Sequence, residues 1–85
     1  MILLDVRTEQ EYQEKHIPGA ILIPVQEIEN RATSELPDKN VVIFVYCRSG
    51  ARSANAAKIL VGKGYTHIYD IGGIIDWPYE TVSGN

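Results

Sequence analysis

The sequence predicts an α/β fold, with a doubly wound and mainly parallel sheet of about four to five strands and helices on both faces. Short apolar segments alternate along the chain with segments whose apolar residues recur at helical spacing. Residues 41–46 are apolar throughout, which is typical of a central strand covered on both faces. With 85 residues, the chain is expected to form a single domain over residues 1–85.

The first half of the chain contains two expected strands and two expected helices. Residues 2–6 are predicted to form a short buried strand. Thr8 can cap a helix over residues 9–15, with Glu11 three positions later completing a capping box. A second strand is expected over residues 20–23, followed by a helix over residues 25–32.

The second half begins with the central strand and continues with a long helix from residue 52 to about residue 62. A further strand is expected over residues 67–70, and Gly72-Gly73 is expected to form a turn that allows close backbone approach beneath the preceding loop. Residues 74–77 are predicted to form one helical turn, with Trp77 as an anchor in the core or at its edge. The tail, residues 79–85, is expected to fray.

Composition excludes several classes of function. The net charge of −3 and a pI near 5.2 give no basic surface for nucleic acid or for a membrane. A single cysteine excludes an internal disulfide, and with only two histidines we expect neither a metal nor a cofactor. No apolar run approaches the roughly 20 residues that span a bilayer. We therefore expect a cytoplasmic location, unless a leader has been removed.

Cys47 lies at the junction between the predicted central strand and the long helix, and this is the most informative position in the chain. The connecting loop is Cys47-Arg48-Ser49-Gly50-Ala51-Arg52. Backbone amides at such a junction, the positive helix end and the two arginines all favour a thiolate. Cys47 is therefore a candidate nucleophile, and we expect it at the mouth of the loop rather than in the core.

Asp5 and Arg7 follow the first strand, so parallel topology should bring them to the same edge of the sheet as Cys47. We expect both to support the scaffold: Asp5 could orient a loop arginine, and Arg7 could pair with Glu11. His16 is expected to cap a helix end or bond to backbone rather than act as a base. His67 carries no functional signal.

Three groups of residues, in this order and spacing, resemble the single-domain rhodanese family of sulfurtransferases. They are Leu4-Asp5-Val6-Arg7 with Glu11-Tyr12 and His16-Ile17-Pro18-Gly19-Ala20, then Val45 to Ser53, then Gly72-Gly73 with Trp77. The resemblance covers nearly the whole sequence and implies a rhodanese-like fold. Many relatives carry an extra strand or helix before the first group, whereas this chain begins almost inside it.

The resemblance implies a two-step reaction through a Cys47 persulfide. Cys47 would take a sulfane sulfur from a small anionic donor such as thiosulfate, and cyanide or a thiol would then accept it. Arg48, Ser49, Gly50, Ala51 and Arg52 would bind the substrate, with Arg48 as the charge that attracts the donor. Arg52 would be a brace of the loop, a second anion contact or a structural ion pair, for which Asp5 is a candidate partner.

Two other functions stay open. In the first, the domain is a sulfur-carrier or binding module whose persulfide passes to a protein partner. In the second, it is a small cysteine-dependent phosphatase. The six-residue Cys-x4-Arg loop weighs against the phosphatase, because phosphatases that resemble this fold use a Cys-x5-Arg loop that suits a larger tetrahedral group. The chain also shows no evident aspartic general acid.

Overall fold

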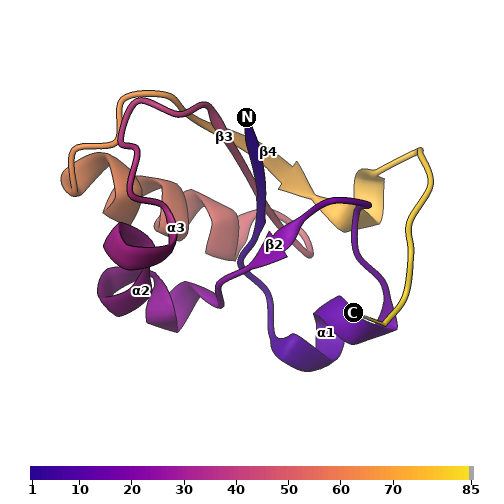
Figure 1. Cartoon of the computed structure of the whole chain (residues 1–85). Helices are drawn as coiled ribbons and strands as arrows, with labels where there is room; N and C mark the ends of the chain where they lie inside the picture. Colours follow the sequence, from indigo (N-terminus) through magenta and orange to yellow (C-terminus); the bar gives the residue numbers. More distant parts are fainter. Residues whose placement is uncertain (85) are drawn as a thin grey trace.

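The computed structural model describes residues 1–84 as a four-stranded parallel sheet with helices on both faces (Figure 1). The strands lie in the order β2-β1-β3-β4. Their bounds are β1 Ile2–Asp5, β2 Ile21–Leu22, β3 Ile43–Cys47 and β4 Ile68–Gly73. The predicted α/β class and parallel topology are confirmed, because every strand pair in the sheet is parallel.

All the helices except the last connect successive strands, as crossover connections between parallel strands require. Their bounds are α1 Glu9–Glu14, η1 Val25–Glu27, α2 Ile28–Glu35, α3 Ala51–Gly62 and η2 Ile74–Asp76, where η denotes a 3-10 helix. The predicted capping box is present at the start of α1, where Thr8 and Glu11 bond reciprocally. The single helix expected over residues 25–32 is instead two helices, and the second continues to Glu35.

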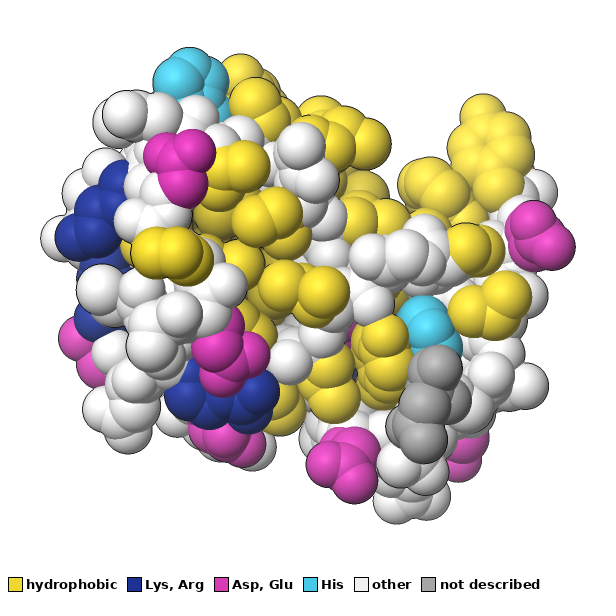
Figure 2. All heavy atoms as spheres, viewed as in Figure 1, with side chains coloured by type: hydrophobic (Ala, Val, Ile, Leu, Met, Phe, Trp, Pro, Cys, Tyr) yellow, Lys and Arg dark blue, Asp and Glu magenta, His cyan; other side chains and the backbone are white. Residues whose placement is uncertain are grey.

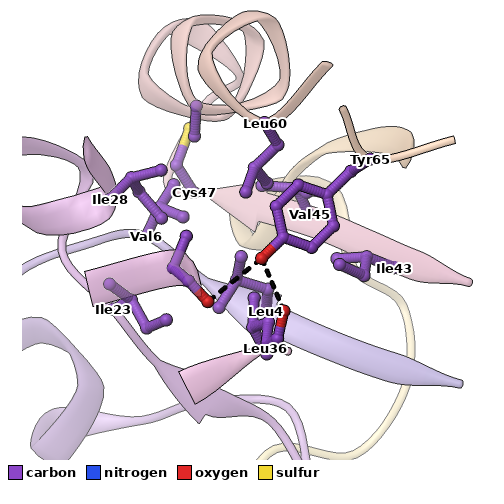
Figure 3. Packing of buried hydrophobic residues seen from close by; sticks show 12 residues of the cluster. Leu4, Val6, Ile23, Ile28, Leu36, Ile43, Val45, Cys47, Leu60 and Tyr65 are labelled. Carbon is purple, nitrogen blue, oxygen red and sulfur yellow. Dashed lines mark hydrogen bonds between the residues drawn. The ribbon is translucent and has the colours of Figure 1, made fainter. Parts of the chain in front are cut away.

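The larger hydrophobic cluster lies between the sheet and the helices α2 and α3 (Figure 3). Alternate residues of β3, Ile43, Val45 and Cys47, point into it, as the two-residue period of a strand requires. Tyr65 donates its hydroxyl to the carbonyls of Ala32 and Leu36 at the end of α2. The Ala32 carbonyl also accepts from the Leu36 amide, so the buried Tyr65 hydroxyl finds its acceptors where α2 ends and attaches this tyrosine to the helix.

The opposite face of the sheet holds a smaller cluster of Ile17, Ala20, Tyr46 and Ile74, with Tyr12 packed against it. Tyr46 and Tyr12 reach this cluster from β3 and α1, so β3 is covered on both sides, as its apolar sequence predicts. Figure 2 shows hydrophobic side chains gathered on one face of the surface. The exposed large apolar residues of the described chain include Ile21, Ile71, Ile75 and Val82.

The C-terminal segment is held rather than frayed, which corrects the sequence prediction. His16 and Val82 exchange backbone hydrogen bonds of 2.8 and 2.9 Å, and the Gly84 amide donates to the Gln13 carbonyl at 2.7 Å. Trp77 is half-buried against the smaller cluster and donates its indole N–H to the Glu80 carbonyl. These bonds attach the tail to α1, beside which it runs in Figure 1.

Candidate active site

The candidate site is the loop between β3 and α3. Cys47 is the last residue of β3, and α3 begins at Ala51, one residue before the predicted start at Arg52. The exposed residues Arg48 and Ser49 form the turn, and Gly50 caps α3 with a φ of 112°. Only glycine adopts this left-handed conformation without strain, so Gly50 lets the chain reverse into α3 immediately behind the cysteine.

The Cys47 sulfur lies inside this turn, pointing toward α3 (Figure 3). The Gly50 amide donates to Sγ at 3.0 Å, and the Ser53 hydroxyl lies 3.5 Å from it. Cys47 is only 1% exposed and belongs to the larger hydrophobic cluster, so the expectation that it lies at the loop mouth rather than in the core is wrong. The sulfur is covered because β3 carries it inward on the face that α3 packs against.

Opposing effects act on the pKa of the Cys47 thiol. Burial raises the pKa, whereas hydrogen bonds from the Ser53 hydroxyl and from the backbone amides of Ser53, Gly50 and Ser49 lower it. The hydrogen bonds prevail, and the thiol pKa lies below its ordinary value. Amides at the start of α3 thus favour the thiolate, which is the form that reacts.

Gly73 lies directly beneath the loop. The register of β3 and β4 is irregular between Val45 and Cys47, so that Cys47 faces Gly73. A Cβ on Gly73 would lie 2.2 Å from the Arg48 carbonyl oxygen and 2.6 Å from the Ser49 Cα. The Ile75 amide donates to the same Arg48 carbonyl at 3.1 Å. The predicted close approach is therefore observed, although Gly72 and Gly73 end β4 instead of forming a separate turn.

Arg52 pairs with Glu11 of α1. Its two terminal nitrogens donate to the two Glu11 carboxylate oxygens at 2.7 and 3.0 Å. This hydrogen-bonded pair lowers the pKa of Glu11 to about 2. Of the alternatives for Arg52, the structural ion pair and brace is the one observed, but its partner is Glu11 and not Asp5.

Asp5 and Arg7 form a buried pair with each other. Arg7 donates to both Asp5 carboxylate oxygens at 2.7 to 3.1 Å and to the Lys15 carbonyl at 2.6 Å. Tyr46 also donates to Asp5, at 2.8 Å. The predicted scaffold role agrees with these contacts, but both predicted partners are wrong: Asp5 orients no loop arginine, and Arg7 does not pair with Glu11.

An open depression of about 410 Å³ lies beside the loop. It is lined by Arg7, Glu11, Glu14, Lys15, Arg48, Ile74 and Ile75. Arg7 and Glu11 are already paired with Asp5 and Arg52, whereas Glu14, Lys15 and Arg48 have no ion-pair partner among residues 1–84. The unpaired charges are therefore two cations and one anion, which leaves a net positive charge available to an anionic ligand.

Three residues of the site region were not found from the sequence. Lys15 lies at the end of α1 and gives no sequence signal for a site across the fold. Ser53 follows the loop directly and could have been noted from that position alone. Nothing in the sequence around Asp70 indicates a functional site. Only the register of β4 brings Asp70 to the Ser53 hydroxyl, at 2.7 Å.

The histidines take no part in the site. His16 bonds through Nδ1 to the Tyr12 carbonyl at 2.8 Å, which confirms the expected backbone contact. Across residues 1–84 there is no cluster of three or more histidine, cysteine or acidic side chains suited to a metal ion. Nor does that part of the chain contain a helix with the length and apolar character needed to cross a membrane.

A family model described as a rhodanese-like domain matches residues 1–78. The chain belongs to the rhodanese-like family. Among similar proteins, this rhodanese-like chain is 42% identical over 81 residues to the thiosulfate sulfurtransferase PspE of Escherichia coli, covering 95% of this chain and 78% of the relative. A sulfurtransferase of Allochromatium vinosum is 44% identical over 79 residues, covering 91% of this chain and 71% of that protein. The resemblance predicted from the three groups of residues is thus confirmed.

Two further comparisons concern a longer relative and a solved structure. The putative sulfur carrier protein YrkF of Bacillus subtilis is 40% identical over 80 residues. The match covers 93% of this chain but only 42% of that longer protein. A solved structure described as a rhodanese with anions from E. coli superimposes with a TM-score of 0.90 at 41% identity, covering 98% of both chains. The rhodanese-like fold therefore extends over essentially the whole described chain.

Proposed function

We propose that this rhodanese-like chain is a sulfurtransferase that carries a sulfane sulfur on Cys47. The observation that carries the proposal is the position of the Cys47 sulfur, 3.0 Å from the Gly50 amide in a loop whose hydrogen bonds lower the thiol pKa. A thiolate held by backbone amides is a nucleophile. The same amides can hold the charge of a terminal persulfide sulfur once it forms.

The reaction divides into two displacements. In the first, the Cys47 thiolate attacks the outer sulfur of thiosulfate, a new sulfur–sulfur bond forms, and sulfite leaves with the electron pair of the bond that breaks. In the second, cyanide or a thiolate attacks the outer persulfide sulfur, and Cys47 leaves as a thiolate. Neither step needs a metal, a cofactor or an external oxidant, because the sulfur atom moves as an electrophile between two nucleophiles.

Arg48 is the residue we assign to attract the anionic donor. It is exposed, unpaired among the described residues, and lines the depression beside the loop together with Lys15. Two cations at one rim raise the local concentration of a small anion in a chain whose net charge is −3. A solved structure described as a rhodanese with anions supports this assignment by analogy.

The identity of the sulfur acceptor distinguishes an enzyme from a sulfur-carrier module. A relative named as a putative sulfur carrier protein favours keeping the carrier as the second candidate, in which the persulfide passes to a thiol on a protein partner. Transfer to cyanide at a rate comparable to transfer to small thiols would support the enzyme. Persulfide formation without turnover by small acceptors would favour the carrier.

The phosphatase alternative is opposed by the position of Arg52. Both of its terminal nitrogens donate to Glu11, so a phosphate in the loop would compete with this ion pair for Arg52. Gly73 beneath the loop also leaves no room for a wider ring of amides, since a single added carbon would collide with Arg48 and Ser49. We expect negligible release of phosphate from p-nitrophenyl phosphate.

The test is a steady-state assay of thiocyanate formation from thiosulfate and cyanide. The wild-type chain should turn over, and Cys47→Ala should be inactive while retaining its fold by circular dichroism. Residual activity in a folded Cys47→Ala protein would remove Cys47 from the mechanism. A reducing, cytoplasmic compartment fits the proposal, because the chemistry requires Cys47 as a free thiol between turnovers.

A further inference from the structure

The buried Ser53 hydroxyl is surrounded almost entirely by hydrogen-bond acceptors. Its oxygen lies 2.7 Å from Asp70 Oδ1, 3.0 Å from the Gly50 carbonyl and 3.4 Å from the Gly72 carbonyl. Cys47 Sγ lies 3.5 Å away. A hydroxyl has one proton, and neither carbonyls nor an ionised carboxylate can return one. The short contact therefore directs the Ser53 proton to Asp70, and the Cys47 thiol is the group that can donate to Ser53.

Asp70 connects this buried pair to solvent. Its Oδ1 accepts hydrogen bonds from both Ser53 and the Gly72 amide, at 2.7 and 2.9 Å, while the Asp70 residue itself is exposed. Cys47 and Ser53, by contrast, are 1% and 0% exposed. The sulfur therefore has a continuous hydrogen-bonded route to water that passes through one hydroxyl and one carboxylate.

We propose that Ser53 and Asp70 form a relay that removes the proton from the Cys47 thiol as the sulfur attacks its donor. The inference rests on the proposed persulfide chemistry and adds Asp70 to it as a positioning residue that acts through Ser53. The relay gives the buried thiol a proton acceptor that the loop amides, which are donors, cannot provide.

The relay conserves protons and electrons. The thiol proton moves to Ser53 Oγ while the original Ser53 proton moves to Asp70 Oδ1, which later releases it to water. The lone pair left on Cys47 forms the bond to the outer sulfur of thiosulfate, and sulfite departs with the pair from the bond that breaks. After the transfer, the Ser53 hydroxyl points at the sulfur and stabilises the thiolate, in agreement with the lowered thiol pKa.

The other charged groups around Cys47 are already engaged or are cations. Arg52 of α3 acts on the sulfur electrostatically, but it is paired with Glu11 of α1. Asp5 of β1 is bound by Arg7. Arg48 of the loop is a cation and cannot accept a proton. Among residues 1–84, Asp70 is thus the carboxylate that a hydrogen-bonded hydroxyl connects to the sulfur.

The test is the pH dependence of the first half-reaction, measured as sulfite released in a single turnover with excess thiosulfate. Asp70→Asn keeps an oxygen that can accept from Ser53 and Gly72, but it cannot take up a proton. Below the thiol pKa, Asp70→Asn should slow persulfide formation by about tenfold or more. Above the thiol pKa, where the sulfur is already ionised, its rate should return to within about twofold of wild type.

Two further variants control the experiment. Ser53→Ala should show the same pH-dependent loss, and the double variant should be no slower than Ser53→Ala alone, because both residues act in one chain. Asp76→Asn removes a carboxylate from η2, at the C-terminal side of β4, without touching the relay, and it should match wild type at every pH. This control separates the relay from a change in net charge.

Three results would overturn the relay. They are an unchanged rate for Asp70→Asn at all pH values, a loss that is equal at low and high pH, and a faster rate at low pH, which would mean that Asp70 merely opposes thiolate formation by its charge. Because wild type must form the persulfide in the same experiment, failure of the relay is distinguishable from failure of the proposed function. In the latter case wild type itself would release no sulfite.

Discussion

Glu11 and Arg52, 41 positions apart in the sequence, form a two-fold hydrogen-bonded ion pair that joins α1 to the start of α3. Glu11 also closes the capping box with Thr8, so one carboxylate fixes both the beginning of α1 and the arginine of the active-site loop. The pair leaves Arg48 as the loop arginine that faces the open depression. The proposed roles of the two arginines, Arg48 toward the donor and Arg52 in the scaffold, rest on this contact.

Glu11→Gln should weaken the fold in a pH-dependent way. The Arg52 hydrogen bonds lower the pKa of Glu11 to about 2 from 4.5. The pKa of Glu11 is lower in the folded protein than in the unfolded chain. The ion pair therefore stabilises the fold fully at pH values above the unfolded pKa, and this contribution is lost as the pH falls toward the folded pKa. For a partly exposed pair we expect a loss of about 1 kcal/mol near neutral pH.

Urea unfolding of wild type and Glu11→Gln from neutral to acidic pH measures this difference. The free energies of unfolding of the two proteins should converge as the pH falls below the pKa of the Glu11 carboxyl group in the unfolded chain. Glu9→Gln is the matched control, since Glu9 lies on the same helix turn and has no ion-pair partner among the described residues. A gap between wild type and Glu11→Gln that persists unchanged at the acidic end would contradict the assignment.

The Cys47 thiol should ionise below the pH range of an ordinary cysteine. Hydrogen bonds from Ser53 and from the Gly50 and Ser49 amides outweigh burial and lower the thiol pKa. Thiolate absorbance in the ultraviolet, followed against pH, should give a midpoint below about 8.5 in the folded protein. The same titration in denaturant provides the reference, and coincident midpoints in the two states would disprove a lowered thiol pKa.

Arg48→Ala should weaken the use of thiosulfate more than it weakens the fold. Arg48 is exposed and lines the depression, so its loss removes attraction for the anion, costing on the order of 1–3 kcal/mol in kcat/KM. The effect should appear mainly as a raised KM and should shrink at high salt.

Steady-state kinetics with thiosulfate, together with a thermal melt, measure both quantities for Arg48→Ala. Lys58→Ala, an exposed cation on α3 away from the depression, should leave KM unchanged and serves as the charge control. Equal effects of the two substitutions would reduce the role of Arg48 to its contribution to net charge.

Gly73→Ala should disturb the active loop, whereas Gly62→Ala should not. A Cβ at Gly73 would lie 2.2 Å from the Arg48 carbonyl oxygen, while one at Gly62 would meet nothing within 4 Å. We expect Gly73→Ala to cost about 1–3 kcal/mol of stability and most of the activity. Gly62→Ala, at the last residue of α3, should stabilise the fold by about 0.5 kcal/mol.

Chemical denaturation and the thiosulfate–cyanide assay on both glycine variants decide the point. The pair is informative because the substitution is identical and only the neighbouring atoms differ. A fully active Gly73→Ala protein would mean that the loop tolerates displacement from β4, and the close approach of Gly73 to Arg48 and Ser49 would then be unimportant for activity.

The parts of the structure that the sequence predicts depend on local patterns. The apolar segment ending at Cys47 and the capping box of Thr8 and Glu11 each act through neighbours a few positions away. Parallel topology then places the ends of β1 and β3 at the same edge without further information. These features suffice to predict the fold and the position of Cys47 at the end of β3, but not the burial of its side chain.

The unpredicted parts depend on which of several long or distant side chains meet. Both Asp5 and Glu11 are carboxylates far from Arg52 in the sequence, so spacing along the chain does not indicate which of them Arg52 pairs with. The burial of Cys47 depends on the packing of α3 against β3. The contact of Asp70 with Ser53 depends on the register of β4, which is irregular opposite the end of β3.

The most direct test of the central claim is the intact mass of the protein after incubation with thiosulfate and removal of the excess. Wild type should gain the mass of one sulfur atom, lose it again on addition of cyanide, and show neither change as Cys47→Ser. A wild-type mass that does not change, or a gain that survives in Cys47→Ser, would contradict the proposal that Cys47 carries the transferred sulfur.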